Sequence, residues 1–184
     1  MSLTLSKMLP LNSMAPVFLL NDVTKGLQVS YDKVKGKKGT LVMFICNHCP
    51  YVIHLREKFV ALAHQYLTLG VGVVAISSND AVRYPQDDPE QMRSLAIDMG
   101  FRFPYLYDET QEVAKAYDAA CTPDFYLFNA KKKLVYRGRL DDSRPGNGVP
   151  VTGSDLIFAL ENLIGNRSQS DIQLPSMGCN IKWR

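Results

Sequence analysis

The sequence lacks an excess of charge of one sign and lacks long apolar runs, and each absence excludes a class of protein. Lys and Arg number 21 against 18 Asp and Glu, a balance too even for the one-sided field that phosphate backbones select. No apolar run reaches the roughly 20 residues of a membrane-spanning helix. The first residues also lack the compact apolar segment of a secretory signal. We therefore expect a soluble, cytoplasmic protein that binds neither nucleic acid nor membrane.

Cysteine is scarce as well, with four in 184 residues. That number is too small for a disulfide scaffold, and in a reducing cytosol a close pair of cysteines is usually catalytic or metal-binding. Cys46 and Cys49 form such a pair, whereas Cys121 and Cys179 stand alone. Since 46% of the residues are hydrophobic, a chain of this length can bury one core. We predict a single domain over residues 1–184, with its core at about 15–165 and a tail at about 166–184.

The apolar patterning predicts an α/β fold with a mixed, mostly parallel central sheet flanked by helices. Continuous apolar runs indicate strands buried on both faces, and helical spacing separates them. A closing pair of strands adds an antiparallel edge. The predicted elements are a β-hairpin over 17–30, strands at 40–45, 71–77 and 103–107, helices beginning near Cys46 and at 89–99 and 110–119, strands at 125–128 and 134–137, and a helix at 154–164 capped by Ser154.

The Cys46-Asn47-His48-Cys49 motif carries the chemistry that the sequence indicates most strongly. Two cysteines at the mouth of a helix can close a reversible disulfide, and the helix N-terminus favours the thiolate of the nearer sulfur. We expect that sulfur to be Cys46, assisted by His48. Its thiolate would attack a substrate disulfide, and Cys49 would release the product from the mixed intermediate. The reaction requires no cofactor and no metal.

These residues resemble the thioredoxin superfamily, in which a strand, a Cys-x-x-Cys motif and a long helix are followed by Thr-Pro before the penultimate strand. The last feature is Thr122-Pro123. The resemblance implies a thioredoxin-like fold, a cis Pro123 set against the dithiol, and a Thr122 backbone offered to a substrate strand. It also implies a disulfide-containing protein or small molecule as substrate and a dithiol as reductant.

Three segments resemble a narrower group within the redoxin branch, the alkyl hydroperoxide reductase and thiol-specific antioxidant type. They are Cys46-Asn-His-Cys-Pro-Tyr-Val52, Leu140-Asp-Asp-Ser-Arg-Pro-Gly146 and Met177-Gly-Cys-Asn-Ile-Lys-Trp183. The chain is similar here to bacterial proteins to which an antioxidant activity is ascribed. It departs from peroxiredoxins, which carry Thr-x-x-Cys at the dithiol and an Arg near Thr122-Pro123. It also departs from thioredoxin, since the strand at 40–45 contains no acid to accept a proton.

Several interpretations remain open at this stage. The chain could be a thiol peroxidase that uses Cys46 or Cys49, or a redox-inert interaction or metal-binding module, because Cys-x-x-Cys is also a zinc knuckle. Cys121 could be a third redox sulfur or a small buried apolar residue. Cys179 could be a resolving thiol carried by a mobile tail, or an idle thiol. Arg144, in the Gly/Pro loop, could approach the dithiol or simply belong to a turn.

Overall fold

The structure is a computed structural model that describes residues 3–184. In chain order the elements are β1 (Leu3–Leu5), β2 (Leu19–Asp22), β3 (Leu27–Ser30), α1 (Tyr31–Val34), β4 (Gly39–Phe44), α2 (Pro50–Thr68), β5 (Val71–Ser77), η1 (Pro85–Asp87), α3 (Pro89–Asp98), β6 (Tyr105–Tyr107), α4 (Glu112–Ala116), β7 (Cys121–Thr122), β8 (Asp124–Asn129), β9 (Leu134–Gly138), α5 (Ser154–Ile164) and β10 (Met177–Asn180). Within the described residues, none of these helices is both long and apolar enough to cross a membrane.

A seven-stranded sheet with the order β3-β2-β6-β5-β4-β8-β9 forms the centre of the molecule. β4, β5 and β6 run parallel, while β8 and β9 on one side and β2 and β3 on the other are antiparallel. Every residue of β4 and β5 is buried, as continuous apolar strands covered on both faces should be. The predicted mixed sheet, its central strands and the N-terminal hairpin are confirmed, and the parallel pairings within this sheet are β4 with β5 and β5 with β6, while the others are antiparallel.

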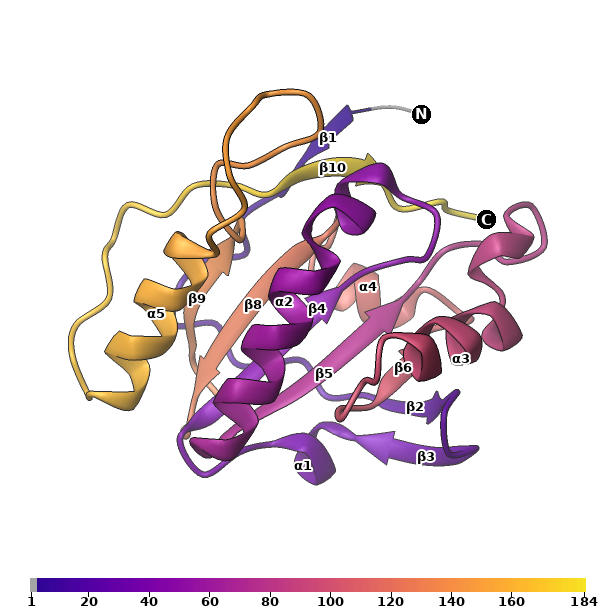
Figure 1. Cartoon of the computed structure of the whole chain (residues 1–184). Helices are drawn as coiled ribbons and strands as arrows, with labels where there is room; N and C mark the ends of the chain where they lie inside the picture. The colour runs from indigo at the N-terminus through magenta and orange to yellow at the C-terminus, as the bar shows by residue number, and fades with distance from the viewer. Residues whose placement is uncertain (1–2) are drawn as a thin grey trace.

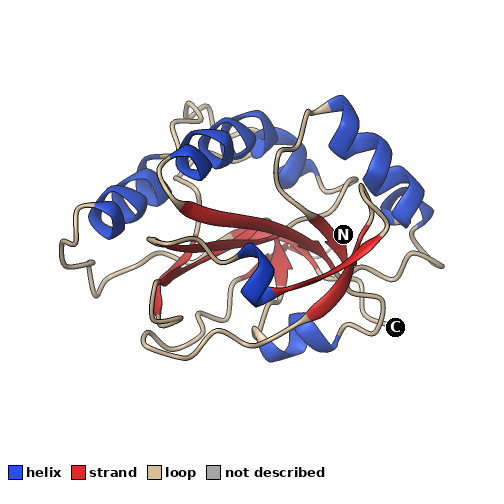
Figure 2. Ribbon diagram, turned by 90° about the horizontal axis from the view of Figure 1, so that it is seen from below, coloured by secondary structure: helices blue, strands red, loops and turns tan. Residues whose placement is uncertain are grey.

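Helices cover both faces of this sheet (Figure 2). α2, α3 and α5 pack on one face, where one core cluster gathers side chains from these helices and from β4 and β5. α1 and α4 pack on the opposite face against a second, aromatic-rich cluster. Because α2 follows directly from β4, its first turn lies at the edge of the sheet where β4 ends (Figure 1).

The start of α5 differs from expectation. Gly153, not Ser154, is the N-cap residue, with φ 75°, a left-handed conformation that glycine adopts without steric cost. The Asp141 carboxylate accepts hydrogen bonds from the backbone N–H groups of Thr152 and Gly153, at 2.7 and 2.6 Å. The predicted Ser154 cap is therefore wrong, and an acid from the preceding loop satisfies the N–H groups at this helix end.

The tail, which shows no clear sequence pattern, forms part of a second, smaller sheet with the order β1-β10-β7. β10 is antiparallel to both neighbours, with Cys179 opposite Leu3 on one side and opposite Thr122 on the other. The strand runs across the top of α2 in Figure 1. The C-terminal segment is thereby brought to the start of α2, where the Cys-x-x-Cys motif lies.

Candidate active site

Cys46 and Cys49 lie in the connection between β4 and α2. Cys49 is the N-cap residue of α2, and Pro50 occupies the first helical position, where its missing N–H has no intrahelical partner to lose. The two thiols share a hydrogen bond. Both residues are buried, with 1% of Cys46 and none of Cys49 exposed. Two sulfurs in direct contact at a helix N-terminus can form a reversible disulfide.

The pKa is lowered for Cys49 and raised for Cys46, whereas the motif led us to expect the thiolate on Cys46. The hydrogen bond from Cys46 lowers the pKa of the Cys49 thiol to about 5, aided by Cys179 and the backbone N–H of Val52 and opposed by burial. The pKa of Cys46 is raised well above its usual value by the same shared hydrogen bond, by burial and by the negative charge of Asp87. The helix begins at Pro50, so its first free N–H groups reach Cys49.

Thr122 and Pro123 face the dithiol across the site. The peptide bond between them is cis, as the resemblance implies. Cys46 Sγ lies 3.3 Å from Thr122 Oγ1, and the neutral Cys49 thiol donates to the Thr122 carbonyl at 3.3 Å. Both sulfurs therefore contact a single threonine, one through its hydroxyl and one through its backbone.

Asp87 is a site residue that the sequence interpretation missed. Its carboxylate is fully buried and accepts hydrogen bonds from the backbone N–H groups of Asn47 and His48, at 2.7 and 3.3 Å. Its second oxygen lies 2.6 Å from His48 Nδ1 and accepts from Asn79 Nδ2 at 2.7 Å. Asp87 thus holds both residues between the cysteines. No local motif marks it, since it reaches the site from η1, far along the chain.

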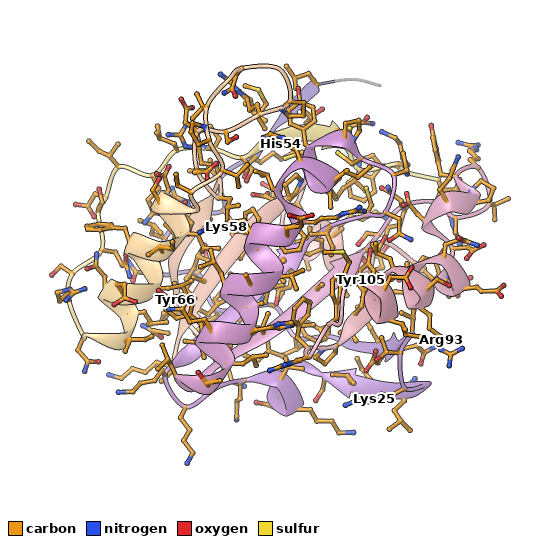
Figure 3. The ribbon with its side chains drawn as sticks, in the orientation of Figure 1. Lys25, His54, Lys58, Tyr66, Arg93 and Tyr105 are labelled. Carbon is orange, nitrogen blue, oxygen red and sulfur yellow. The ribbon has the colours of Figure 1, made fainter. Side chains whose placement is uncertain are left out.

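Aromatic rings fix the same two residues from other sides. The His48 ring stacks on Tyr84, with centroids 5.6 Å apart and an interplanar angle of 4°, and the ammonium of Lys182 lies 5.7 Å from the centre of the Tyr84 ring. The Tyr105 hydroxyl donates to Asn47 Oδ1 at 3.1 Å; Figure 3 shows Tyr105 beside α2, on the side of α3. His48 and Asn47 are therefore held in place rather than free to rotate.

The same residues could hold a metal ion. The ligand atoms of Cys46, His48 and Asp87 all lie within 4.8 Å of one another, and sulfur, imidazole and carboxylate are all zinc donors. The sequence alone did not predict this group of ligands, because Asp87 comes close to Cys46 and His48 only in the folded chain. The prediction that the site works without a metal stays a prediction.

The two remaining cysteines lie in different surroundings. Cys179, on β10, shares a hydrogen bond with Cys49. The Cys121 thiol instead contacts the Ser176 carbonyl at 4.0 Å, and burial raises its pKa. Cys121 is followed closely by Asp124, a fully buried acid whose pKa is raised to about 7 by burial. Its carboxylate accepts hydrogen bonds from the hydroxyls of Ser6 and Tyr126, at 3.0 and 2.8 Å.

Two polar residues lie beside the site and contact the elements around it. His54, on the first turns of α2 (Figure 3), has Nε2 2.7 Å from Ser143 Oγ. This contact ties His54 to the 141–153 loop. Arg144 directs its guanidinium to Met177 Sδ at 3.3 Å. This arginine joins the loop to β10, the strand that covers the dithiol.

The fold and the dithiol opposite a cis-proline define a thioredoxin-like protein of the redoxin type. The chain belongs to the AhpC/TSA family, whose model matches residues 11–137. No curated protein matches the chain.

Solved structures extend the likeness over the whole chain. An uncharacterized conserved protein of Geobacillus kaustophilus is 54% identical with a TM-score of 0.98, covering 100% of this chain and 97% of that one. A hypothetical protein of Sinorhizobium meliloti is 43% identical with a TM-score of 0.95, covering 98% of both chains. The thioredoxin domain of a thiol-disulfide oxidoreductase from Bacteroides vulgatus is 19% identical, with a TM-score of 0.61 and coverage of 73% of this chain and 92% of that one. This last likeness shows the fold alone.

Proposed function

We propose that the protein is a thiol-disulfide oxidoreductase that exchanges disulfides through Cys46 and Cys49. The observation that carries the proposal is that both sulfurs lie at the start of α2 and 3.3 Å from Thr122, Cys46 from its hydroxyl and Cys49 from its carbonyl oxygen, beside cis Pro123. Membership of the AhpC/TSA family supports a redox role. The substrate is a disulfide in a protein or small molecule, a second dithiol restores the enzyme, and the role is antioxidant redox homeostasis in the cytoplasm.

The electrostatics favour Cys49 as the attacking thiolate, in place of the Cys46 expected from the motif. Cys49 holds the negative charge because Cys46 donates a hydrogen bond to it and Val52 offers a backbone N–H. In the proposed order, Cys49 attacks the substrate disulfide and forms a mixed disulfide with one substrate sulfur. Cys46 then attacks Cys49 Sγ, the second substrate thiol leaves, and the Cys46–Cys49 disulfide remains.

Reduction of insulin disulfides with dithiothreitol as the electron source tests the proposal. Cys49→Ser should reduce turnover to the uncatalysed rate, and so should Cys46→Ser when Cys179, which also contacts Cys49, is replaced by Ser as well. Cys121→Ser, a matched loss of a thiol outside the proposed pair, should keep the turnover. The Cys46→Ser, Cys179→Ser double variant should in addition accumulate a mixed disulfide with substrate through Cys49. Full turnover by this double variant would reject the dithiol mechanism. Accumulation of a mixed disulfide in Cys49→Ser alone would restore Cys46 as the attacking sulfur.

A peroxidase activity is the second candidate, and one observation favours it. Cys49 occupies the last position of the Thr-x-x-Cys pattern of peroxiredoxins, at a helix N-cap and with a lowered pKa. Cys46 stands in the place of that threonine. Stoichiometric consumption of hydrogen peroxide that requires Cys49 but not Cys46 would establish this activity in place of disulfide exchange.

A redox-inert metal-binding module is the third candidate function. It would require Cys46, His48 and Asp87 to hold an ion. Metal analysis of the purified protein, with a thiol count before and after mild oxidation, distinguishes it from a dithiol enzyme. A bound equivalent of zinc that prevents oxidation of the two thiols would favour the module.

A further inference from the structure

β10 occupies the place beside Thr122 at which a substrate strand would pair. β7 contributes Thr122 and Cys121, and their backbones are paired with Cys179 and Asn180 of β10. The outer edge of β10 is in turn covered by β1. The chain therefore fills, with its own C-terminal segment, the edge that the proposed function assigns to a substrate.

The contact between β10 and the cis-proline segment is close enough to require glycine. A Cβ atom on Gly178 would lie 2.0 Å from the Thr122 carbonyl oxygen and 3.4 Å from Pro123 Cδ. The neighbouring Cys179 is only 4% exposed. β10 thus packs directly on the wall of the site and takes part in sealing the buried dithiol from solvent.

β10 also brings a third sulfur into contact with the pair. Cys179 shares a hydrogen bond with Cys49, and Cys49 shares another with Cys46. Cys49 therefore contacts both of the other sulfurs. Burial and the contact with Cys49 raise the pKa of Cys179 to about 12.

We propose that Cys179 is a third redox thiol, which takes over the disulfide from Cys46 and locks β10 across the substrate edge in the oxidised protein. This inference rests on the proposed dithiol function. Cys179 loses its proton, and its sulfur attacks Cys49 Sγ in the Cys46–Cys49 disulfide. The Cys49–Cys179 bond forms, the Cys46–Cys49 bond breaks, and Cys46 leaves as a thiolate that takes up the proton. The step is an isomerisation, so it needs no external oxidant or reductant.

The strand pairing explains why Cys179 is the thiol that reacts with Cys49. In the proposed exchange, Cys49 reacts with a substrate sulfur carried by a strand beside Thr122. Cys179 already lies on such a strand, opposite Thr122. β10 therefore occupies the position of a substrate strand. In the oxidised protein, a reducing dithiol must cleave the Cys49–Cys179 disulfide before β10 can move away and a substrate strand can bind.

Tryptic mapping of the full-length protein tests the inference. Trypsin leaves Cys46 and Cys49 in one peptide, from Gly39 to Arg56, and Cys179 in another, from Ser168 to Lys182. The protein is oxidised with one equivalent of diamide, quenched in acid, alkylated and digested without reductant. Formation of the Cys49–Cys179 disulfide joins the two peptides into one cross-linked mass, whereas the Cys46–Cys49 disulfide leaves them separate.

The Cys46→Ser variant gives the sharpest result, because Cys49 then has only Cys179 beside it. We expect the cross-linked peptide to be the main oxidised product in monomers of this variant, and to be a measurable fraction in the wild type. Cys179→Ser and Cys49→Ser should lack the cross-link. Cys121→Ser, whose thiol contacts Ser176 instead, should form it to the wild-type extent. Far-ultraviolet circular dichroism of each variant verifies folding.

The outcomes separate this inference from the proposed function. A wild type that forms the Cys46–Cys49 disulfide and reduces insulin, while Cys179 stays fully alkylated in both wild type and Cys46→Ser, overturns the relay and leaves the dithiol enzyme standing. A cross-link found only in disulfide-linked dimers also overturns it. A protein that forms neither disulfide and reduces no insulin refutes both.

Discussion

The charge on Cys49 depends on the neighbouring thiol, so removal of Cys46 should shift the titration of Cys49. The hydrogen bond from Cys46 is the largest cause of the lowered pKa of about 5. The Cys46→Ala substitution removes that donor, while burial, which raises the pKa of Cys49, stays. We expect the pKa of Cys49 to rise toward the ordinary cysteine value of about 8.5, although the contacts with Cys179 and the Val52 backbone, which lower it, remain.

The expected change is large at neutral pH. A thiol with a pKa of about 5 is about 99% thiolate at pH 7, whereas one with a pKa of about 8.5 is only about 3% thiolate. The thiolate population of Cys49 should therefore fall by up to roughly 30-fold in the variant. Any reaction that uses this thiolate should slow by a comparable factor, apart from the change in nucleophilicity that accompanies a higher pKa.

Ultraviolet absorbance of the thiolate, followed from acid to neutral pH, measures this shift. Cys121 and Cys179 do not interfere, because burial raises the pKa values of both thiols. Cys121→Ala is the matched control and should titrate as the wild type does. A Cys46→Ala protein that still titrates near pH 5 would refute the assigned hydrogen bond. A low-pKa thiolate that persists in Cys49→Ala would place the charge on Cys46.

Three further predictions address the surroundings of the dithiol. Burial raises the pKa of Asp124 from 3.8 to about 7. Between about pH 4 and pH 7 the carboxyl group therefore keeps its proton in the folded state but has lost it in the unfolded state, so the free energy of unfolding should fall by about 4 kcal/mol over this range as pH rises. In denaturant titrations, Asp124→Asn should lack this part of the pH dependence of the free energy of unfolding. A pH profile equal to that of the wild type would contradict the raised pKa of Asp124. Asp87→Asn should lower the free energy of unfolding by about 1–3 kcal/mol, since an amide cannot accept all the hydrogen bonds of the buried carboxylate; equal stability would show that His48 is held by other contacts. Gly178→Ala should displace β10 from Thr122 and speed alkylation of the dithiol, whereas wild-type protection would disprove the close packing inferred for this strand.

Much of the fold is encoded in local patterns that a reader of the sequence can recognise. The continuous apolar runs at 40–45 and 71–77 correspond to β4 and β5, both entirely buried, because strands covered on both faces need no polar alternation. Pro89 opens α3, as a proline at the first helical position should. The spacing of Cys46 and Cys49 predicted a dithiol, and the resemblance to thioredoxins implied the cis conformation of Pro123, which the structure has.

The surroundings of the dithiol were decided by the tertiary structure alone. Asp87 contacts His48, and β10 pairs with Thr122, because segments far apart in the chain pack together. No short sequence motif predicts such contacts. The residue at which α2 begins also affects the electrostatics of the dithiol. A helix that begins at Pro50 directs its free N–H groups to Cys49, whereas a start a few residues earlier would have favoured Cys46. The sequence by itself thus identified two cysteines as a pair, and only the folded chain brought Asp87 and a third cysteine against them, because electrostatic fields and strand pairing depend on distances that folding creates.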